Sequence, residues 1–477
     1  MKKLTRREFL RIAGLTAASA TALTALEACA PKATPTPAPA TQPPAAPTAA
    51  PTPVPTKPPA KTGKIVEFFA WGGPTDIPMW DVMAKNFMKQ YPDFLIKISI
   101  GPWGGTLGTE YYTKLQTQIA GGAPPDIAGF QGWEWQPFAD KGVLAPVEDY
   151  IKRDNFTDPW PDFPVVHTTC ERKGHTWHIP LQMATMVMFY AKKHFDEAGI
   201  PYPTDDWTME EFLDIAQKLT KTSGDVKRWG YQANGNWYRD IHWIRSTGKQ
   251  EFDTLVDPHK AQFNQPEIVD IVQLVASDVY YKLKISPTPA DLEGGANTID
   301  TGNCAMKYEG AWYFPNLMSP KLQEEGKAVP FDVVLMPKGA DPNRPHRGWS
   351  EGVNILKTGR EDDAWEFAKY MAGPEGNKIH SEITGRIPNS PKLVEEFWLP
   401  MIKEKFGVQN GRAFLEAFKR AQVDVIGGVP RSKMWAEVVK PVAWDPLTQG
   451  TAKAADVLPE VDKKLQALLD EYWKEQG

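Results

Sequence analysis

Three aromatic residues crowd around a carboxylate in the stretch PDIAGFQGWEW, residues 125–135. Phe130, Trp133 and Trp135 offer flat apolar faces, and Glu134 offers hydrogen-bond acceptors between the two tryptophans. Rings in such number form either hydrophobic core or a surface on which a ligand stacks. A short apolar segment precedes them and is typical of a β-strand, so we expect the cluster at the carboxyl end of that strand.

Other patterns that could do chemistry are sparse. The sequence holds neither a His-Glu-x-x-His pattern nor a phosphate-binding loop. His175 and His178 stand three residues apart in HTWH, which raises the question of a metal site. Aspartate and glutamate are plentiful, so a carboxylate pair for glycoside cleavage stays open.

Strands and helices that would position these residues alternate from residue 64 onward. The segments 64–73 and 93–101 read as strands, and 81–92 reads as an amphipathic helix that ends at a proline. The segment 111–130 then gives a helix, a Gly/Pro turn and a third strand. This order predicts an α/β fold with a parallel sheet, whose ligands gather at strand carboxyl ends.

Size and charge limit the classes of protein. At 477 residues and 53.3 kDa the chain exceeds one ordinary hydrophobic core, which predicts two lobes. The formal net charge of -5 is spread without a long basic run, so no nucleic-acid partner is expected.

The first 62 residues have the layout of an exported, tethered protein. Residues 1–29 combine a basic start, a mildly apolar stretch and Cys29, and TRREFLR resembles a twin-arginine export signal. LEAC resembles a lipobox, with Glu27 where a small residue is usual, and predicts a lipid on Cys29. Residues 30–62 are almost entirely Pro, Ala and Thr and predict a disordered tether. Cys170 and Cys304 are expected to be unpaired thiols.

Motifs in a fixed order over about 400 residues carry a resemblance to a known family. They include AGGAPPDIAGF with FADKGVLAPVEDYI, then GHTWHIPLQMATMVMFYAKKHFDEAG, TGNCAMKYEGAWYF and GWSEGVNILKTGREDDAWEFAKYMAGPEG. The chain resembles extracellular solute-binding proteins of family 1, the maltose-binding type, which serve ABC importers. Each motif is weak alone, but their order is specific.

The resemblance implies a two-lobe periplasmic-binding-protein-like fold (type II) that closes on a ligand by hinge motion. It implies an N-terminal lobe of 63–172 plus 350–395 and a C-terminal lobe of 173–349 plus 396–477. It further implies a monomer at the extracytoplasmic face of the cell membrane that binds a sugar or oligosaccharide, needs no cofactor or metal, and works with the transmembrane subunits of an ABC permease. In the family HTWH is a β-hairpin, so the resemblance puts His175 and His178 on opposite sides rather than on one metal.

A sugar ring has an apolar face and a belt of hydroxyls, so its binder needs flat rings beside donors and acceptors. Residues at positions that match family contact sites are Trp71, Asp76, Phe130, Trp133, Glu134, Gln182, Thr185, Trp312, Trp349, Glu351 and Trp435. Tryptophans expected instead in the core of helices are Trp207, Trp365, Trp398 and Trp473.

Three alternatives remain open at this stage. The same fold could take a non-sugar solute such as a polyol phosphate or a peptide, although a cleft rich in tryptophan and carboxylates favours a neutral sugar. An exported carbohydrate-active enzyme would need a carboxylate pair at catalytic separation. An adhesion or scaffold module would explain the tether but not the order of the motifs.

Overall fold

The computed structural model describes residues 63–73, 76–104, 108–221 and 227–476, so the predicted export signal, Cys29 and the tether lie outside the described residues. Ten strands are described, namely β1 (Lys64–Trp71), β2 (Phe94–Gly101), β3 (Ile127–Gln131), β4 (Glu171–Arg172), β5 (His175–Thr176), β6 (Ile179–Ala191), β7 (Met306–Gly310), β8 (Phe331–Val334), β9 (His346–Ile355) and β10 (Ala421–Gln422). Eight of them form one sheet in the order β2-β1-β3-β9-β6-β7, with β10 beside β9 and β8 beside β6.

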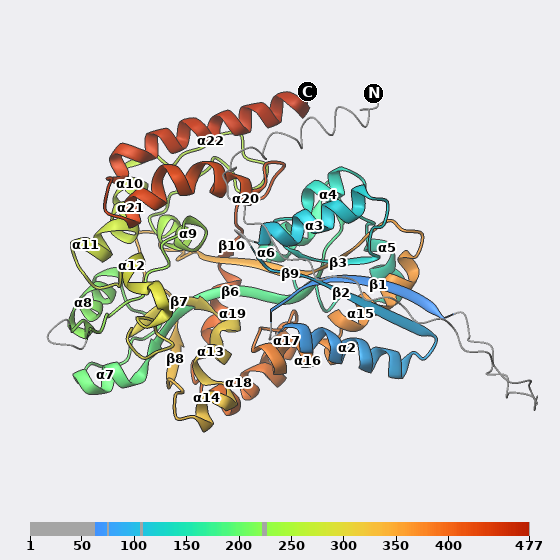
Figure 1. Ribbon diagram of the computed structural model, residues 1–477, viewed down its shortest axis with the longest axis horizontal. Coiled ribbons are helices and arrows are strands. Elements are labelled where there is room, and N and C mark those ends of the chain that lie inside the picture. Colours follow the sequence, from blue (N-terminus) through green and yellow to red (C-terminus); the bar gives the residue numbers. More distant parts are fainter. Residues whose placement is uncertain (1–62, 74–75, 105–107, 222–226, 477) are drawn as a thin grey trace, which may run out of the picture. The chain divides into compact units, whose positions relative to one another are not determined.

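Helices surround this sheet in the described ranges (Figure 1). They are α2 (Asp76–Gln90), α3 (Thr109–Ala120), α4 (Gln136–Asp140), α5 (Glu148–Asp154), α6 (Pro164–Cys170), α7 (Lys192–Ala198), α8 (Met209–Leu219), α9 (Trp237–Arg245), α10 (Pro266–Gln273), α11 (Val279–Tyr281), α12 (Pro289–Leu292), α13 (Phe314–Met318), α14 (Pro320–Glu324), α15 (Glu361–Ala372), α16 (Pro374–Thr384), α17 (Pro391–Leu393), α18 (Leu399–Phe406), α19 (Arg412–Lys419), α20 (Arg431–Lys433), α21 (Asp445–Thr448) and α22 (Ala454–Gln476). Short π-helical turns at Leu274–Asp278, Val394–Trp398 and Met434–Trp444 join some of them. None of the helices in these ranges is long and apolar enough to cross a bilayer.

The first strands follow the predicted alternation of strand and helix. β1 pairs in parallel with β2 on one side and with β3 on the other. Val66, Phe68 and Ala70 of β1 share a core with α2 and α15, whereas Phe69 and Trp71 share a second core with α3 and α4. Because successive side chains point to opposite faces of a strand, both faces of this part of the sheet are covered, as a parallel sheet requires.

Two long strands, β6 and β9, link the two halves of the sheet. β6 is buried along its whole length and pairs with β9 through 179–185, and with β7 and β8 through 186–191. β9 pairs with β3 through 351–355 and with β10 through 346–347. The β1–β3 half and the β7–β8 half are therefore held by the same two strands. The residue boundaries given above for the lobes stay a prediction.

Gly352 marks the tightest point of this junction. A Cβ atom at Gly352 would lie 2.0 Å from the carbonyl oxygen of Ile179 and 2.9 Å from the amide nitrogen of Leu181. The register between β6 and β9 shifts at the same place, between Pro180 and Gln182. Only a residue without a side chain allows the strands to approach so closely.

Gly352→Ala is therefore expected to lower the free energy of unfolding by about 1–3 kcal/mol, because the strands must separate to admit the methyl group. The measurement is a guanidinium unfolding titration. Gly73→Ala serves as the control, since the nearest atom to its Cβ would be 3.9 Å away. Equal midpoints for the two variants would contradict the expected clash.

Several local expectations can be compared directly with the structure. Cys170 and Cys304 are both buried free thiols, as predicted, and Cys304 forms an isolated bridge just before β7. His175 lies in the β4–β5 hairpin, whereas His178 follows it just before β6, and the two have different partners, Glu148 and Asn354. Trp207 is buried as expected, but its placement on a helix was wrong: Thr208 caps the amino end of α8, so Trp207 precedes the helix.

Candidate functional site

The centre of the candidate site is a cluster of tryptophans from three separate segments. Trp133 follows β3, Trp349 lies in β9, and Trp312 lies in the 3-10 turn that follows β7. The rings of Trp133 and Trp349 are 4.8 Å apart at 66°, and those of Trp349 and Trp312 are 5.7 Å apart. The fold thus brings together three of the tryptophans that the sequence predicts to contact a ligand.

Two arginines lie on these rings, and the sequence reasoning missed both. The guanidinium carbon of Arg431 is 4.0 Å from the ring centroid of Trp133, and that of Arg347 is 4.1 Å from the centroid of Trp349. Asp424 accepts hydrogen bonds from Nε (2.8 Å) and Nη2 (2.7 Å) of Arg347 and from Nη1 of Arg431. One buried carboxylate is therefore shared by two cations that also stack on aromatic faces.

Some polar atoms of the cluster have no partner. Within the described residues, Trp133 Nε1, Glu134 Oε1, and Nε and Nη2 of Arg431 are buried without a hydrogen bond. Each such group costs about 1–3 kcal/mol relative to a paired one. A polar ligand that paired with them would therefore gain more here than at an exposed surface.

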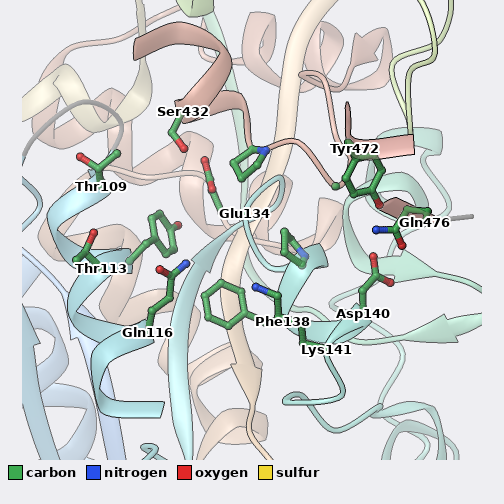
Figure 2. A pocket seen from close by; sticks show the side chains of 14 residues that line it. Thr109, Thr113, Gln116, Glu134, Phe138, Asp140, Lys141, Ser432, Tyr472 and Gln476 are labelled. Atoms are coloured by element: carbon green, nitrogen blue, oxygen red, sulfur yellow. The ribbon is translucent and has the colours of Figure 1, made fainter. Parts of the chain in front are cut away.

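Glu134 connects the cluster to a cavity of about 450 Å³. It points into the cavity from the turn between β3 and α4, and the walls come from α3 and the end of α22 (Figure 2). The lining includes Thr109, Thr113, Gln116, Phe138, Ser432, Tyr472 and Gln476. Burial raises the pKa of Glu134 to about 7, although Arg431 opposes the rise. The carboxyl group can therefore donate or accept a hydrogen bond near neutral pH.

A further pair of charges lies beside Trp312. Trp312 Nε1 donates to Glu309 Oε1 at 3.0 Å, and the same oxygen is 2.5 Å from Arg239 Nη1. Trp435 lies farther out, in contact with Tyr238 at 5.3 Å, and Tyr238 in turn lies 5.7 Å from the Arg431 guanidinium. Trp435 is thus joined to the cluster through Tyr238 rather than through Trp133 or Trp349.

Glu351 borders the cluster, because its Oε2 accepts a hydrogen bond from Trp349 Nε1 at 3.5 Å. The other predicted residues do not lie in the cluster. Trp71, Gln182 and Glu351 surround a narrow void near the β6–β9 junction, together with His380 and Arg386. Phe130 is fully buried in the core beside α3 and α4. The hydroxyl of Thr185 donates to the Arg347 carbonyl oxygen at 2.7 Å. In this arrangement these residues build the frame of the site.

Asp76 forms an ion pair. Its Oδ1 lies 2.6 Å from Arg386 Nη1, and its Oδ2 accepts from the amide of Gly73 at 3.1 Å. Burial opposes ionisation, but Arg386 and the Gly73 amide outweigh it and hold the pKa of Asp76 below its usual range. A lowered carboxyl pKa stabilises the fold above the unfolded-state value of about 3.9, and this stabilisation is lost as pH falls through the folded-state pKa.

Asp76→Asn is accordingly expected to lower the free energy of unfolding by about 1–3 kcal/mol at pH 7, with a difference from the wild type that shrinks below about pH 4. Unfolding titrations between pH 3 and pH 8 measure this difference. Asp81→Asn on the same helix removes only an exposed pair with Lys85 and should change stability by less than about 0.5 kcal/mol. A deficit for Asp76→Asn that stayed constant with pH would contradict the ion pair.

The charges of the cluster correct the expectation that the site offers mainly tryptophan and carboxylates. Arg347 could have been found, since it lies two residues before Trp349 in a strand and so shares its face. Arg431 and Asp424 carry no local signal, because tertiary structure alone brings them to Trp133.

The geometry of the described residues supports neither a serine nucleophile nor a metal site. GWSEG, residues 348–352, matches the Gly-x-Ser-x-Gly pattern, which the sequence reasoning overlooked. Ser350 lies inside strand β9, however, and not in the sharp strand-to-helix turn that a nucleophile requires. Across the described ranges, no group of three or more His, Cys, Asp or Glu residues is placed to hold a metal ion.

Comparisons with known proteins place this geometry in context. The maltotriose-binding protein of Pyrococcus abyssi is 22% identical over 363 residues, which is 75% of this chain and 74% of that protein. The sn-glycerol-3-phosphate-binding periplasmic protein of Escherichia coli K12 is 23% identical over 66% of this chain and 74% of its own length.

Solved structures agree in fold. An ABC substrate-binding protein of Listeria monocytogenes in complex with cycloalternan superposes with a TM-score of 0.73 at 23% identity, over 86% of this chain and 99% of that one. Maltose-bound MalE3 of T. maritima gives a TM-score of 0.69 at 18% identity, over 85% and 99%. The predicted two-lobe, periplasmic-binding-protein-like α/β fold is thereby confirmed.

The family model described as bacterial extracellular solute-binding protein matches residues 72–378, more than half of the chain. The match confirms the resemblance stated from the sequence and identifies an extracytoplasmic substrate-binding protein of the ABC-transporter type rather than an enzyme. This chain belongs to the bacterial extracellular solute-binding protein family.

Proposed function

We propose that the protein captures a sugar or oligosaccharide between its lobes and delivers it to the membrane subunits of an ABC importer. The observation that carries the proposal is the cluster of Trp133, Trp349 and Trp312 with unpartnered polar atoms at Trp133, Glu134 and Arg431. Flat rings suit the apolar face of a sugar, and unpaired donors and acceptors suit its hydroxyls. Relatives whose names state maltotriose, cycloalternan and maltose as ligands support the same class.

The interactions available in such a site are sufficient for micromolar affinity. One aromatic stack contributes about 1 kcal/mol beyond the burial of its area, and pairing of the buried polar atoms contributes about 1–3 kcal/mol each. Two stacks and a few hydrogen bonds reach about -8 kcal/mol, which corresponds to micromolar affinity. Specificity then rests on the polar atoms.

A polyol phosphate is the second candidate ligand, and one observation favours it. Arg347 and Arg431 lie side by side on the tryptophan rings, and arginine is the residue that suits phosphate best. A relative named for sn-glycerol 3-phosphate adds to this alternative.

Tryptophan fluorescence of the purified protein tests the function. We expect one class of mono- or oligosaccharide to give a saturable change at micromolar concentration, with no reducing sugar released in the same samples. Sugar phosphates and peptides are titrated in parallel. Release of reducing sugar, or a response to peptides alone, would refute capture of a sugar by this site.

The proposal also includes a lipid anchor and closure of the two lobes. A lipid on Cys29 would hold the protein at the outer face of the cell membrane, with residues 30–62 as the tether. Lobes of 63–172 plus 350–395 and 173–349 plus 396–477 would close about β6 and β9 as a monomer. Metabolic labelling with palmitate tests the anchor: the label should be incorporated by the wild type and lost in Cys29→Ala.

A further inference from the structure

The charges around Trp133 do not balance. Arg347 and Arg431 are both buried, with 5% and 0% of their side chains exposed, and both donate to the one carboxylate of Asp424. Glu134 is the remaining acid near Arg431, and burial raises its pKa, which weakens its contribution as an anion. Two buried guanidinium groups therefore share the one carboxylate of Asp424.

Arg431 also has more hydrogen-bond donors than partners. Arg431 uses Nη1 for Asp424, whereas its Nε and Nη2 have no partner within the described part of the chain. These two groups form one edge of the guanidinium, the edge that pairs with both oxygens of a carboxylate. Trp133 Nε1, on the ring that Arg431 covers, lies close to the Glu134 carboxyl group but makes no hydrogen bond of good geometry within the described residues.

We propose that the captured carbohydrate is acidic and carries a carboxylate, as a uronic acid does, which pairs with the Nε and Nη2 edge of Arg431. The proposal rests on the sugar-binding function above and names its substrate class. Trp133 follows β3 and Arg431 begins α20, so these side chains belong to segments far apart in the sequence, and the carboxylate enters when the two side chains separate. Trp133 Nε1 then donates to the same acid group.

A carboxylate suits the charges better than a phosphate does. One negative charge brings the group of Arg347, Arg431 and Asp424 to balance, whereas a phosphate dianion would exceed it and face the carboxyl group of Glu134 as well. Burial and the neighbouring Arg347 lower the pKa of Arg431, whereas Glu134 raises it.

The cavity beside Glu134 indicates that the acidic unit has neighbours. Its volume of about 450 Å³ exceeds what one carboxylate occupies, and beside the charged Glu134, Asp140 and Lys141 its wall offers neutral hydrogen-bonding side chains. These are Thr109, Thr113, Gln116, Ser432 and Gln476. Hydroxyl groups of adjoining sugar rings match such a wall, so the ligand is an acidic oligosaccharide rather than a free acid monosaccharide.

Calorimetry with matched ligands tests the proposal on the full protein. The probes are short oligomers of galacturonate, of alginate uronates and of glucuronate-containing disaccharides, each compared with its carboxyl-reduced counterpart of equal length. We expect one acidic probe to bind at least about 10-fold more tightly than its reduced form. Equal or tighter binding of the neutral form overturns the acidic class but leaves sugar capture standing. Binding of glucose 6-phosphate or glycerol 3-phosphate alone assigns the arginines to phosphate. Failure of every carbohydrate overturns both proposals.

Single substitutions test whether the carboxylate of the ligand binds at Arg431. Arg431→Gln should weaken the acidic probe on the order of 10- to 100-fold and change the reduced probe by less than about 3-fold. Lys433→Gln removes an exposed positive charge from the same helix α20 and should leave both affinities unchanged. Trp133→Phe keeps a ring but removes the indole N–H, and should weaken the acidic probe several-fold if Arg431→Gln does not fold. An equal loss for both probes in either variant overturns the role of the acid group.

Discussion

Replacing Asp424 by asparagine is expected to lower the free energy of unfolding by about 3–5 kcal/mol. Asp424 is fully buried and accepts hydrogen bonds from both Arg347 and Arg431. The neutral amide removes the carboxylate that the two buried guanidinium groups share, and the cost of removing their charges from water is then no longer offset by it. A guanidinium unfolding titration measures the difference.

An exposed ion pair supplies the control for this variant. Asp206 pairs with Lys338 at 2.5 Å, but 86% of its side chain is exposed. Asp206→Asn should therefore change stability by less than about 0.5 kcal/mol. If Asp424→Asn were equally mild, the two arginines would not depend on Asp424, and the charge imbalance inferred for the cluster would lose its basis.

Trp133→Ala is expected to weaken ligand affinity by at least about 30-fold, the loss typical of a central aromatic contact worth about 2 kcal/mol or more. Trp133 contacts Trp349 on one side and Arg431 on the other, so its removal eliminates a stacking face and releases the arginine. Isothermal titration with the sugar identified by fluorescence provides the affinity.

Trp473 provides a matched tryptophan away from the cluster. Its ring stacks on His259 with 4.0 Å between centroids, and its Nε1 donates to the carbonyl of Pro258. Trp473→Ala should leave the affinity within about twofold of the wild type. Loss of affinity in both variants would indicate a general effect on folding, which far-ultraviolet circular dichroism of each variant would reveal.

Much of the frame could be predicted because it depends on local patterns. The alternation of Val66, Phe68 and Ala70 with Phe69 and Trp71 defines β1, a strand covered on both faces. α2 ends before the predicted proline stop. The helix placement of Trp207 was wrong because the capping box formed by Thr208 and Glu211, a recognisable signal, was overlooked.

The site was less predictable because its contacts join distant segments. Asp76 is a side chain of the type that contacts ligands, but it accepts a hydrogen bond from Arg386, which lies 310 residues away in the sequence. Phe130 follows the pattern of a stacking residue, yet it lies in the core against Tyr112 and Phe138. No local spacing brings Asp424 and Arg431 to Trp133, so the polar half of the site required the structure.

The edge-to-face contact between Trp133 and Trp349 also has an optical consequence. Two indole rings held 4.8 Å apart at 66° are close enough for their electronic transitions to couple, and coupled transitions produce a paired positive and negative band in circular dichroism. One ring follows β3 and the other lies in β9, so any displacement of these segments changes the coupling. The protein thus carries an intrinsic chromophore pair that reports the geometry of its own binding cluster without an added label.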